Sequence, residues 1–268
     1  MPLAPGTRLG SYEVVGGIGA GGMGEVYRAH DTVLNRDVAL KLVHPDVCHQ
    51  PDSLTRLRRE ARALAALNHP NVATLHELAE FGGSCGLVME LVSGETLAEL
   101  IRRRRLPIAE VLRLAVQIAA ALEAAHERGV THRDLNPANI KIPHAGVVKV
   151  LDFGLVKELD SGDDSGVTAM GHVVGTPLYM APEGARGPAN VDARSDVYSV
   201  GAVAYALLTG KQVFTGDSGV EIISHHLFTP PTPPSERLGR PVDPFLADGR
   251  VKGLVDDMAP RQLELGQV

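Results

Sequence analysis

The stretch THRDLNPANI, Thr131–Ile140, contains the polar side chains that decide the fold of this chain. A His-Arg pair precedes Asp134, and Asn139 follows five residues after that Asp. An Asp and an Asn in one loop can orient a hydroxyl and bind a hard cation. Asn136 stands where a loop that handles phosphate would be expected to carry a cation. The stretch therefore leaves three interpretations: a working catalyst, a weakened one, or a binding module of the same shape.

The residues after this loop, IKIPHAGVVKVLDFG, predict a strand that is followed by Asp152. Asp134, Asn139 and Asp152 would then come from adjacent loops. Two carboxylates and an amide suit Mg²⁺, which prefers oxygen ligands together with phosphate oxygens. Each of the three residues alone could simply form a turn. All three in this order favour a site for a metal and a hydroxyl.

A glycine-rich stretch, GIGAGGMGEVY at residues 17–27, contains the spacing Gly19-x-Gly21-x-x-Gly24. This spacing also occurs in dinucleotide-binding turns, but such a turn needs a helix directly after it. The residues that follow here predict a strand instead. A glycine hairpin between two strands can fold over phosphates and offer them backbone N–H groups. A flexible hairpin without a ligand is the alternative.

Lys41 lies among apolar neighbours in a predicted strand, DVALKLV. By itself it could be an edge-strand lysine that faces water. Glu60, however, lies on the apolar stripe of a predicted helix, three residues after Leu57 and four before Leu64. A carboxylate that faces inward is costly unless it is paired. We therefore expect Lys41 and Glu60 to pair, with the lysine in reach of the α- and β-phosphates of a nucleotide.

The overall composition excludes several classes of protein. The chain has 268 residues, of which 44% are hydrophobic and 22% charged, and its formal net charge is −6. These values are typical of a soluble globular protein and argue against a nucleic-acid-binding one. We expect no signal peptide and no membrane segment in this chain, because no apolar run is long enough. Cys48 and Cys85 have no paired spacing, which predicts reduced thiols in a cytoplasmic protein.

The pattern of apolar residues changes from strands to helices along the chain. Strands are predicted at residues 12–15, 25–29, 38–43, 75–80 and 86–91, with one helix that begins at Pro51. Helices are predicted at 96–104, from Pro107 to just before Gly129, and at 192–209, where Gly210 can end the helix. The sequence thus predicts an α+β fold with a hinge near residues 90–94.

In chain order, these motifs resemble those of the eukaryotic-type (Hanks-type) serine/threonine protein kinases of bacteria. The resemblance implies a bilobal protein-kinase-like fold, with a β-rich N-lobe at 1–91 and a mainly α-helical C-lobe at 92–268. It extends from about Leu9 and fades after about residue 235. The matching residues are Gly19-x-Gly21-x-x-Gly24-x-Val26, Val38-Ala39-Leu40-Lys41, Glu60, His132-Arg133-Asp134, Asn139, Asp152-Phe153-Gly154, Ala181-Pro182-Glu183 and Asp196.

The resemblance also assigns roles to residues. It implies that Asp134 orients the acceptor hydroxyl and that Asn139 and Asp152 hold Mg²⁺. Asn136 and Thr176 belong to the same catalytic group, and Thr176 resembles the Thr that supports Ser/Thr acceptors. ATP is expected to contact residues of the N-lobe and hinge, with Met89 as the gatekeeper: Ile18, Gly19, Gly21, Gly24, Val26, Ala39, Lys41, Glu60, Met89, Glu90 and Val92.

The segment between Asp152 and Glu183 is rich in Gly, Ser and Asp. Arg133 beside the catalytic Asp suggests a docking cation for a phosphorylated residue of this segment. Thr168 is the first candidate for autophosphorylation, and Ser165 is the second.

Two departures from the family pattern bear on activity. Family members usually carry Lys where this chain has Asn136, and the loss of one electrostatic donor can slow a reaction on the order of 10²–10³-fold. We expect the C-terminal end to be divergent or truncated relative to the family, with one helix around residues 251–258 and Arg261 as a candidate partner of Glu183. We therefore expect reduced turnover and marginal stability.

These observations predict an ATP- and Mg²⁺-dependent kinase that phosphorylates Ser or Thr of a protein substrate. The alternative is a nucleotide-binding pseudokinase that acts as a scaffold, which Asn136 and the C-terminal end favour. The presence of the full set favours the enzyme, because a pure scaffold would not need all of its members: Lys41, Glu60, Asp134, Asn139 and Asp152. A small-molecule kinase is a third interpretation, weakened because the Ala181-Pro182-Glu183 motif with Thr176 resembles a platform for a protein substrate.

Overall fold

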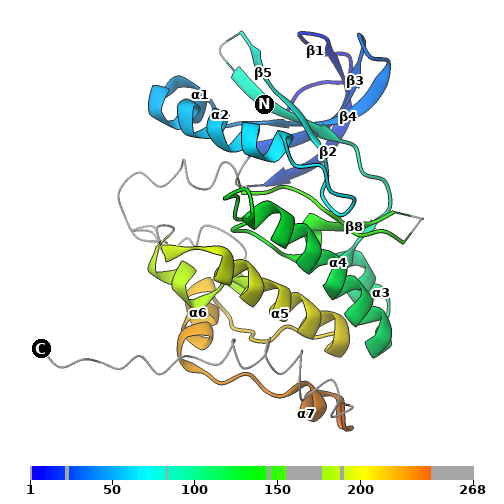
Figure 1. Ribbon diagram of the computed structural model, residues 1–268, viewed down its shortest axis with the longest axis vertical. Coiled ribbons are helices and arrows are strands. Elements are labelled where there is room, and N and C mark those ends of the chain that lie inside the picture. The colour runs from blue at the N-terminus through cyan, green and yellow to red at the C-terminus, as the bar shows by residue number, and fades with distance from the viewer. Residues whose placement is uncertain are drawn as a thin grey trace, which may run out of the picture. The chain divides into compact units, whose positions relative to one another are not determined.

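The structure is a computed structural model that describes residues 2–21, 24–82, 84–143, 146–154, 177–187 and 190–242 (Figure 1). The described residues form two compact units. The first comprises residues 2–94, 120–132 and 141–154, and the second comprises residues 95–119 and 133–140 together with the described residues from 177 onward. The predicted division after residue 91 stays a prediction, because the units are groups of contacting residues and not sequence segments.

The first unit is built on a six-stranded antiparallel sheet in the order β1-β2-β3-β4-β6-β5. Its core cluster is formed by Tyr12, Ala29, Val38, Leu40 and Val88, which come from four of the strands. The strands are β1 (Arg8–Leu9), β2 (Tyr12–Gly21), β3 (Gly24–Asp31), β4 (Arg36–Leu42), β5 (Leu75–Phe81) and β6 (Ser84–Glu90). All five predicted strands are confirmed, but β2 runs on through the glycine-rich stretch.

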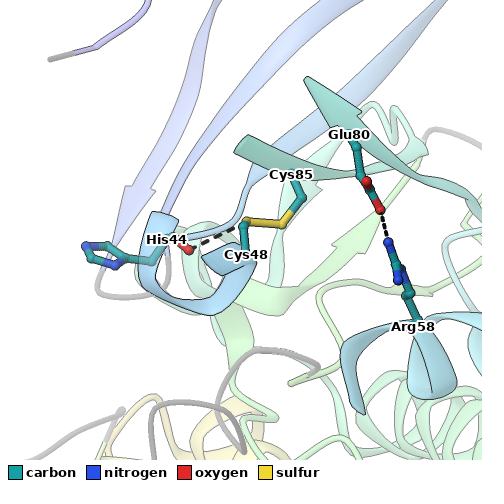
Figure 2. Close-up of a disulfide and its surroundings, with 5 residues drawn as sticks. All are labelled: His44, Cys48, Arg58, Glu80 and Cys85. Carbon is teal, nitrogen blue, oxygen red and sulfur yellow. Dashed lines mark hydrogen bonds and ion pairs between the residues drawn. A yellow bond between two sulfur atoms is a disulfide. The ribbon is translucent and has the colours of Figure 1, made fainter. Parts of the chain in front are cut away.

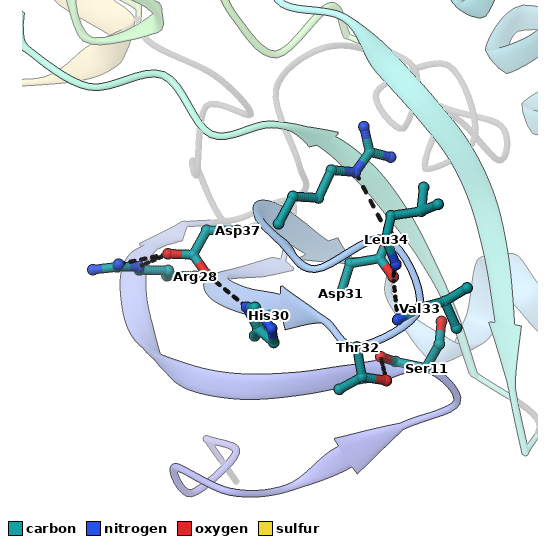
Figure 3. A network of polar contacts seen from close by, with 9 residues as sticks. Ser11, Arg28, His30, Asp31, Thr32, Val33, Leu34 and Asp37 are labelled. Carbon is teal, nitrogen blue, oxygen red and sulfur yellow. Dashed lines mark hydrogen bonds and ion pairs between the residues drawn. The ribbon is translucent and has the colours of Figure 1, made fainter.

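The tight connection between β3 and β4 fixes where β4 begins, and Figure 3 shows its polar contacts. Asp31 is 2% exposed. Its Oδ1 accepts hydrogen bonds from the backbone N–H groups of Val33 and Leu34, both at 3.1 Å, and Arg36 lies 3.5 Å away. Burial alone would raise the pKa of this carboxyl, but these bonds outweigh burial and the pKa is lowered. The turn therefore holds the start of the strand that contains Lys41.

Two helices accompany this sheet. The short α1 (Pro45–His49) is followed, after Gln50, by α2 (Pro51–Ala65). The predicted start at Pro51 is confirmed, because proline is well tolerated in the first turn of a helix. Leu57, Ala61 and Leu64 are buried at the predicted helical spacing. The first unit also contains the last turns of α4 (Ile108–His126), most of β8 (Ile140–Ile142) and β9 (Lys149–Val150).

The two cysteines correct one expectation. Cys48 of α1 and Cys85 of β6 are joined by a disulfide, so the prediction of two reduced thiols is wrong. The residues are 37 apart in sequence, but the fold brings their Cα atoms to 6.0 Å, which is within the usual range for a bridge. Sequence spacing could not show this proximity, because it results from packing a helix against a sheet.

The second unit is mainly helical. Its α5 (Ala193–Thr209) is buried on nearly every side and is capped by Asp192, whose side chain accepts a hydrogen bond from the N–H of Arg194. Gly210 ends the helix in a left-handed conformation, as predicted. The remaining elements are β7 (Glu95–Thr96), α3 (Leu97–Arg103), the first part of α4, the 3-10 turns η1 (Pro137–Asn139), η2 (Pro177–Tyr179) and η3 (Pro182–Arg186), α6 (Gly219–Phe228) and α7 (Pro234–Leu238).

Candidate active site

The glycine-rich stretch forms a hairpin between β2 and β3, with Gly21 paired to Gly24 and Gly19 to Val26. A strand follows the glycines, so the dinucleotide-binding turn is excluded. Gly24 has a φ of +122°, and a Cβ on it would lie 2.1 Å from the carbonyl oxygen of Leu42. Only glycine fits this position, because a side chain would both strain the backbone and collide with β4.

Lys41 is buried near the end of β4, between Val26 of β3 and Leu87 of β6. It is only 4% exposed. Its Nζ lies 2.7 Å from Oδ1 of Asp152, which compensates the buried positive charge. The structure thus brings together two of the residues singled out in the sequence. The pairing of Lys41 with Glu60, which is half-buried on α2, stays a prediction.

Asp152 is held in place by the residues around it. It has a φ of +57°, which is unusual for a residue other than glycine. The next residue, Phe153, packs its ring 4.7 Å from that of His132. The N–H of Gly154 donates to the carbonyl oxygen of His132 at 2.9 Å, and an imidazole nitrogen of His132 lies 2.9 Å from the carbonyl oxygen of Leu151. The fully buried His132 therefore fixes the turn that presents Asp152.

The end of β6 and the segment that follows it are held by two lysines that the sequence reasoning missed. The N–H of Glu90 donates to the carbonyl of Thr74 at 2.8 Å, and Nζ of Lys149 donates to Oε2 of Glu90 at 2.9 Å. Although burial raises the pKa of the Glu90 carboxyl, the hydrogen bond from Lys149 and one from Thr74 lower it overall. Nζ of Lys141 donates to the carbonyl oxygen of Val92 at 2.9 Å. The predicted hinge residues Glu90 and Val92 thus have fixed positions relative to β8 and β9.

The loop quoted first lies in the second unit from Arg133 to Ile140. The backbone N–H of Arg133 donates to Oδ1 of Asp196 at 2.9 Å, and Asp196 is 1% exposed. Arg133 has a φ of +64°. Nδ2 of Asn139 donates to the carbonyl oxygen of Asp134 at 3.0 Å. These contacts tie the loop to α5 at one end and close it on itself at the other.

Asn136 is engaged within its own loop. It is 6% exposed. Its Oδ1 accepts a hydrogen bond from the N–H of Ala138 at 2.9 Å, and its Nδ2 donates to the carbonyl of Asp134 at 3.0 Å. Asn136 therefore caps the η1 turn, a role for which a short amide side chain is well suited.

Glu183 has a partner that the sequence did not suggest. The hydroxyl of Ser195 in α5 donates to its Oε1 at 2.6 Å. The candidate partner Arg261 lies outside the described residues, as do Thr176, Thr168, Ser165 and the helix expected around 251–258.

The structure thus brings Lys41 together with Asp152 in the first unit, and Asp134, Asn136 and Asn139 together in the second. That these two groups of residues form one shared site stays a prediction. Among the described residues, no group of three or more His, Cys, Asp or Glu side chains could hold a metal. The described part of the chain also has no helix that is long and apolar enough to cross a membrane.

Comparison with known proteins decides the family. Residues 12–237 match the protein kinase domain. The chain belongs to the protein kinase domain family. This kinase domain is 42% identical to the serine/threonine-protein kinase PknB of Mycobacterium leprae over 231 residues, which are 84% of this chain and 37% of the relative. It is 40% identical to PknA of Mycobacterium tuberculosis, covering 85% of this chain and 53% of the relative.

The kinase domain also matches a solved structure, the PknI kinase domain of Mycobacterium tuberculosis. The TM-score is 0.70 at 29% identity, and the match covers 97% of this chain and 92% of the other. The expected protein kinase fold, an N-terminal antiparallel sheet followed by a helical region, is therefore confirmed. The chain spans only 37% of the length of the PknB relative.

Proposed function

We propose that this kinase domain transfers the γ-phosphoryl group of ATP to a Ser or Thr hydroxyl of a protein. The contact between the buried Lys41 ammonium and Asp152, at 2.7 Å, is the observation that supports this most directly. A buried lysine beside a carboxylate, on the strand next to a glycine hairpin, is an arrangement suited to hold and neutralise a nucleoside triphosphate. The family membership supports the same reaction.

The ATP-binding residues are expected to be those of the first unit. The backbone of the glycine hairpin would approach the phosphates, because Gly19, Gly21 and Gly24 have no side chains to prevent it. Ala39 and Met89 are paired neighbours on β4 and β6, and we expect them beside the base. The Glu90 carbonyl and the Val92 N–H would meet its edge. Ile18, Val26 and Glu60 complete the set.

Asn139 and Asp152 fit a magnesium ion by their chemistry, because both offer oxygen atoms that Mg²⁺ prefers. The nitrogen of the Asn139 amide is bound to the Asp134 carbonyl, so the amide oxygen is the atom suited to a cation. Bound Mg²⁺ would neutralise charge on the phosphates. Asp134 would accept a hydrogen bond from the acceptor hydroxyl and orient it.

We propose that turnover is slow because of Asn136. Both ends of its amide bind the backbone of the loop, and a neutral amide adds no positive charge near a transferring phosphoryl group. The rate cost of losing one such donor is on the order of 10²–10³. ATP binding would persist, since Lys41 and the hairpin are unaffected.

The partners follow from the reaction. We propose a protein substrate with a Ser or Thr acceptor, and autophosphorylation at Thr168 or Ser165, with Thr176 as the supporting Thr. A cytoplasmic location is part of the proposal, because ATP is available there.

A pseudokinase scaffold is the second candidate, favoured by the engaged Asn136. Mass spectrometry of the purified protein after incubation with Mg-ATP distinguishes the kinase from the scaffold, because it detects added phosphate. The Asp134→Asn variant is the control. We expect phosphate on the parent and none on the variant. Stabilisation by nucleotide with no phosphate in either protein would establish the scaffold and overturn the kinase.

A further inference from the structure

The disulfide lies next to the strand that contains Lys41. The carbonyl oxygen of Cys85 accepts a hydrogen bond from the N–H of Val43 at 2.9 Å. The next residue pair along β4 and β6 is Leu42 with Gly86, and the pair after that is Lys41 with Leu87. The bridge therefore attaches its helix to the sheet two residues from the buried lysine.

The other end of the bridge lies at the start of α2. Cys48 is in α1, which ends at His49, and a single residue, Gln50, separates α1 from α2. Gln50 is bonded to the first turn of α2, since its carbonyl accepts from the N–H of Leu54 at 2.9 Å. α2 also contacts the sheet through an ion pair between Arg58 and Glu80, which Figure 2 shows beside the disulfide. That pair is largely exposed and contributes little, so the bridge is the stronger of these two attachments, which act beside the buried apolar face of α2.

The two cysteine residues differ in their exposure to solvent. Cys85 is 1% exposed, whereas Cys48 is partly exposed. A reductant in solution can therefore reach the bridge through Cys48. Access of this kind is typical of reversible disulfides, because exchange requires direct attack of a thiolate on sulfur.

We propose that Cys48 and Cys85 form a reversible redox site that controls how firmly α2 is held against the sheet. In the reducing direction, a thiolate of a dithiol attacks Sγ of Cys48, and the electron pair of the S–S bond leaves on Cys85, which takes up a proton. The second thiol of the dithiol then displaces Cys48, so that the reductant becomes a disulfide. In the oxidising direction, hydrogen peroxide takes two electrons and two protons from the two thiols, and the products are the bridge and two molecules of water.

In the oxidised form the residues expected to bind the nucleotide are held more rigidly. α2 contains Glu60, the expected partner of Lys41. The bridge joins α1, which directly precedes α2, to β6, which pairs with the strand of Lys41. It therefore restricts the motion of α2 relative to that strand. This step rests on the proposed ATP binding. If reduction leaves α2 correctly placed in only a third of the molecules, the apparent affinity for ATP falls about threefold.

Hydrogen exchange followed by mass spectrometry tests the site without requiring activity. The purified protein is compared after peroxide treatment, after reduction with a dithiol, and after reoxidation, and non-reducing peptide mapping establishes the bridge. We expect faster exchange in residues 51–65 on reduction and recovery on reoxidation, while residues 193–209 of α5 do not change. The dissociation constant of Mg-ATP should rise about threefold on reduction.

Cys48→Ser is the matched variant, because the position is partly exposed and the replacement has nearly the same size. It should show the exchange of the reduced parent and no response to reductant. Unchanged exchange of residues 51–65 between the parent's two states would overturn the proposal, as would a response that persists in Cys48→Ser. If ATP binds neither state while the exchange responds, the redox site stands and the proposed function fails.

Discussion

At the scale of single residues, Asn136 shows how a substitution can keep the shape of a loop and lose part of its chemistry. The amide caps the η1 turn through the N–H of Ala138 and the carbonyl of Asp134. A cap of this type contributes roughly 1 kcal/mol. The loop is therefore maintained by a residue that has no charge to offer a phosphoryl group.

Asn136→Lys should raise kcat for phosphorylation at least about tenfold, because it supplies the charge that the proposed reaction lacks. The melting temperature should fall by a few degrees, since the cap is lost. Steady-state kinetics with Mg-ATP and a Ser/Thr peptide measures the first effect.

Asn136→Ala is the control, because it removes the cap without adding charge. It should lower stability in the same way without a gain in kcat. An equal gain in both variants would show that loop mobility, and not charge, limits the rate.

Gly24 gives a second prediction at this scale. Gly24→Ala places a Cβ 2.1 Å from the carbonyl of Leu42, at a φ of +122°. We expect a loss of about 1–3 kcal/mol in the free energy of unfolding, because the β2–β3 hairpin must shift. Denaturant titration measures it. Gly16→Ala is the matched control, since a Cβ there meets nothing within 4 Å, and a similar loss in both would contradict the role of the contact.

At the scale of elements, the lysines of β8 and β9 position the predicted hinge. Lys149 is mostly buried, with 18% of its side chain exposed, and its ion pair with Glu90 is shielded from solvent more than a surface pair would be. Lys149→Met keeps the length of the side chain and removes the bond. We expect the KM for ATP to rise about threefold or more, with little change in the KM for the peptide.

The control for the hinge is Lys149→Arg, which retains the charge and should recover part of the affinity for ATP. A variant Lys149→Met with unchanged KM for ATP, or with both KM values raised equally, would show that the lysine stabilises the fold without positioning the hinge.

Comparison of elements with sequence shows which features a pattern can predict. The glycine hairpin, the start of α2 at Pro51 and the end of α5 at Gly210 all depend on local chemistry, and each was predictable. The disulfide and the bond from Ser195 to Glu183 join residues of different elements, 37 and 12 positions apart, so no local spacing reveals them. Lys141 and Lys149 were missed because a lysine in a short strand usually faces water. The sequence also did not reveal that Lys41 lies against Asp152.

At the scale of the whole molecule, the stability of each of the two units depends on a different chemical group. The first contains the disulfide, and the second contains His226, which is 2% exposed. The Nδ1 atom of His226 lies 2.6 Å from the hydroxyl of Tyr198, and the ring of Phe214 stacks edge-on at 4.9 Å. Burial lowers the pKa of His226 from 6.5 to about 4. The imidazole is therefore neutral in the folded protein at pH values where the unfolded chain would already be protonated.

This difference makes stability depend on pH in a defined window. Between about pH 6.5 and pH 4 the unfolded state binds a proton that the folded state does not, so stability falls as the pH falls. The loss approaches about 3 kcal/mol at the lower end of this window. Chemical denaturation at several pH values measures it, and His226→Gln, which cannot titrate, should flatten this part of the curve.

The response to reduction and the response to low pH should also be separable in one molecule. Acidification from pH 7 to pH 5 should lower the hydrogen-exchange protection factors of α5 and α6, which are the intrinsic exchange rates divided by the observed rates at each pH, because Tyr198 and His226 join these helices. Reduction at pH 7 should instead speed exchange in α2, which the bridge anchors. Cys48→Ser should abolish only the second effect and His226→Gln only the first. If either treatment loosened both units equally, the kinase domain would unfold as a single cooperative body, and local control of the nucleotide-binding unit by its disulfide would be impossible.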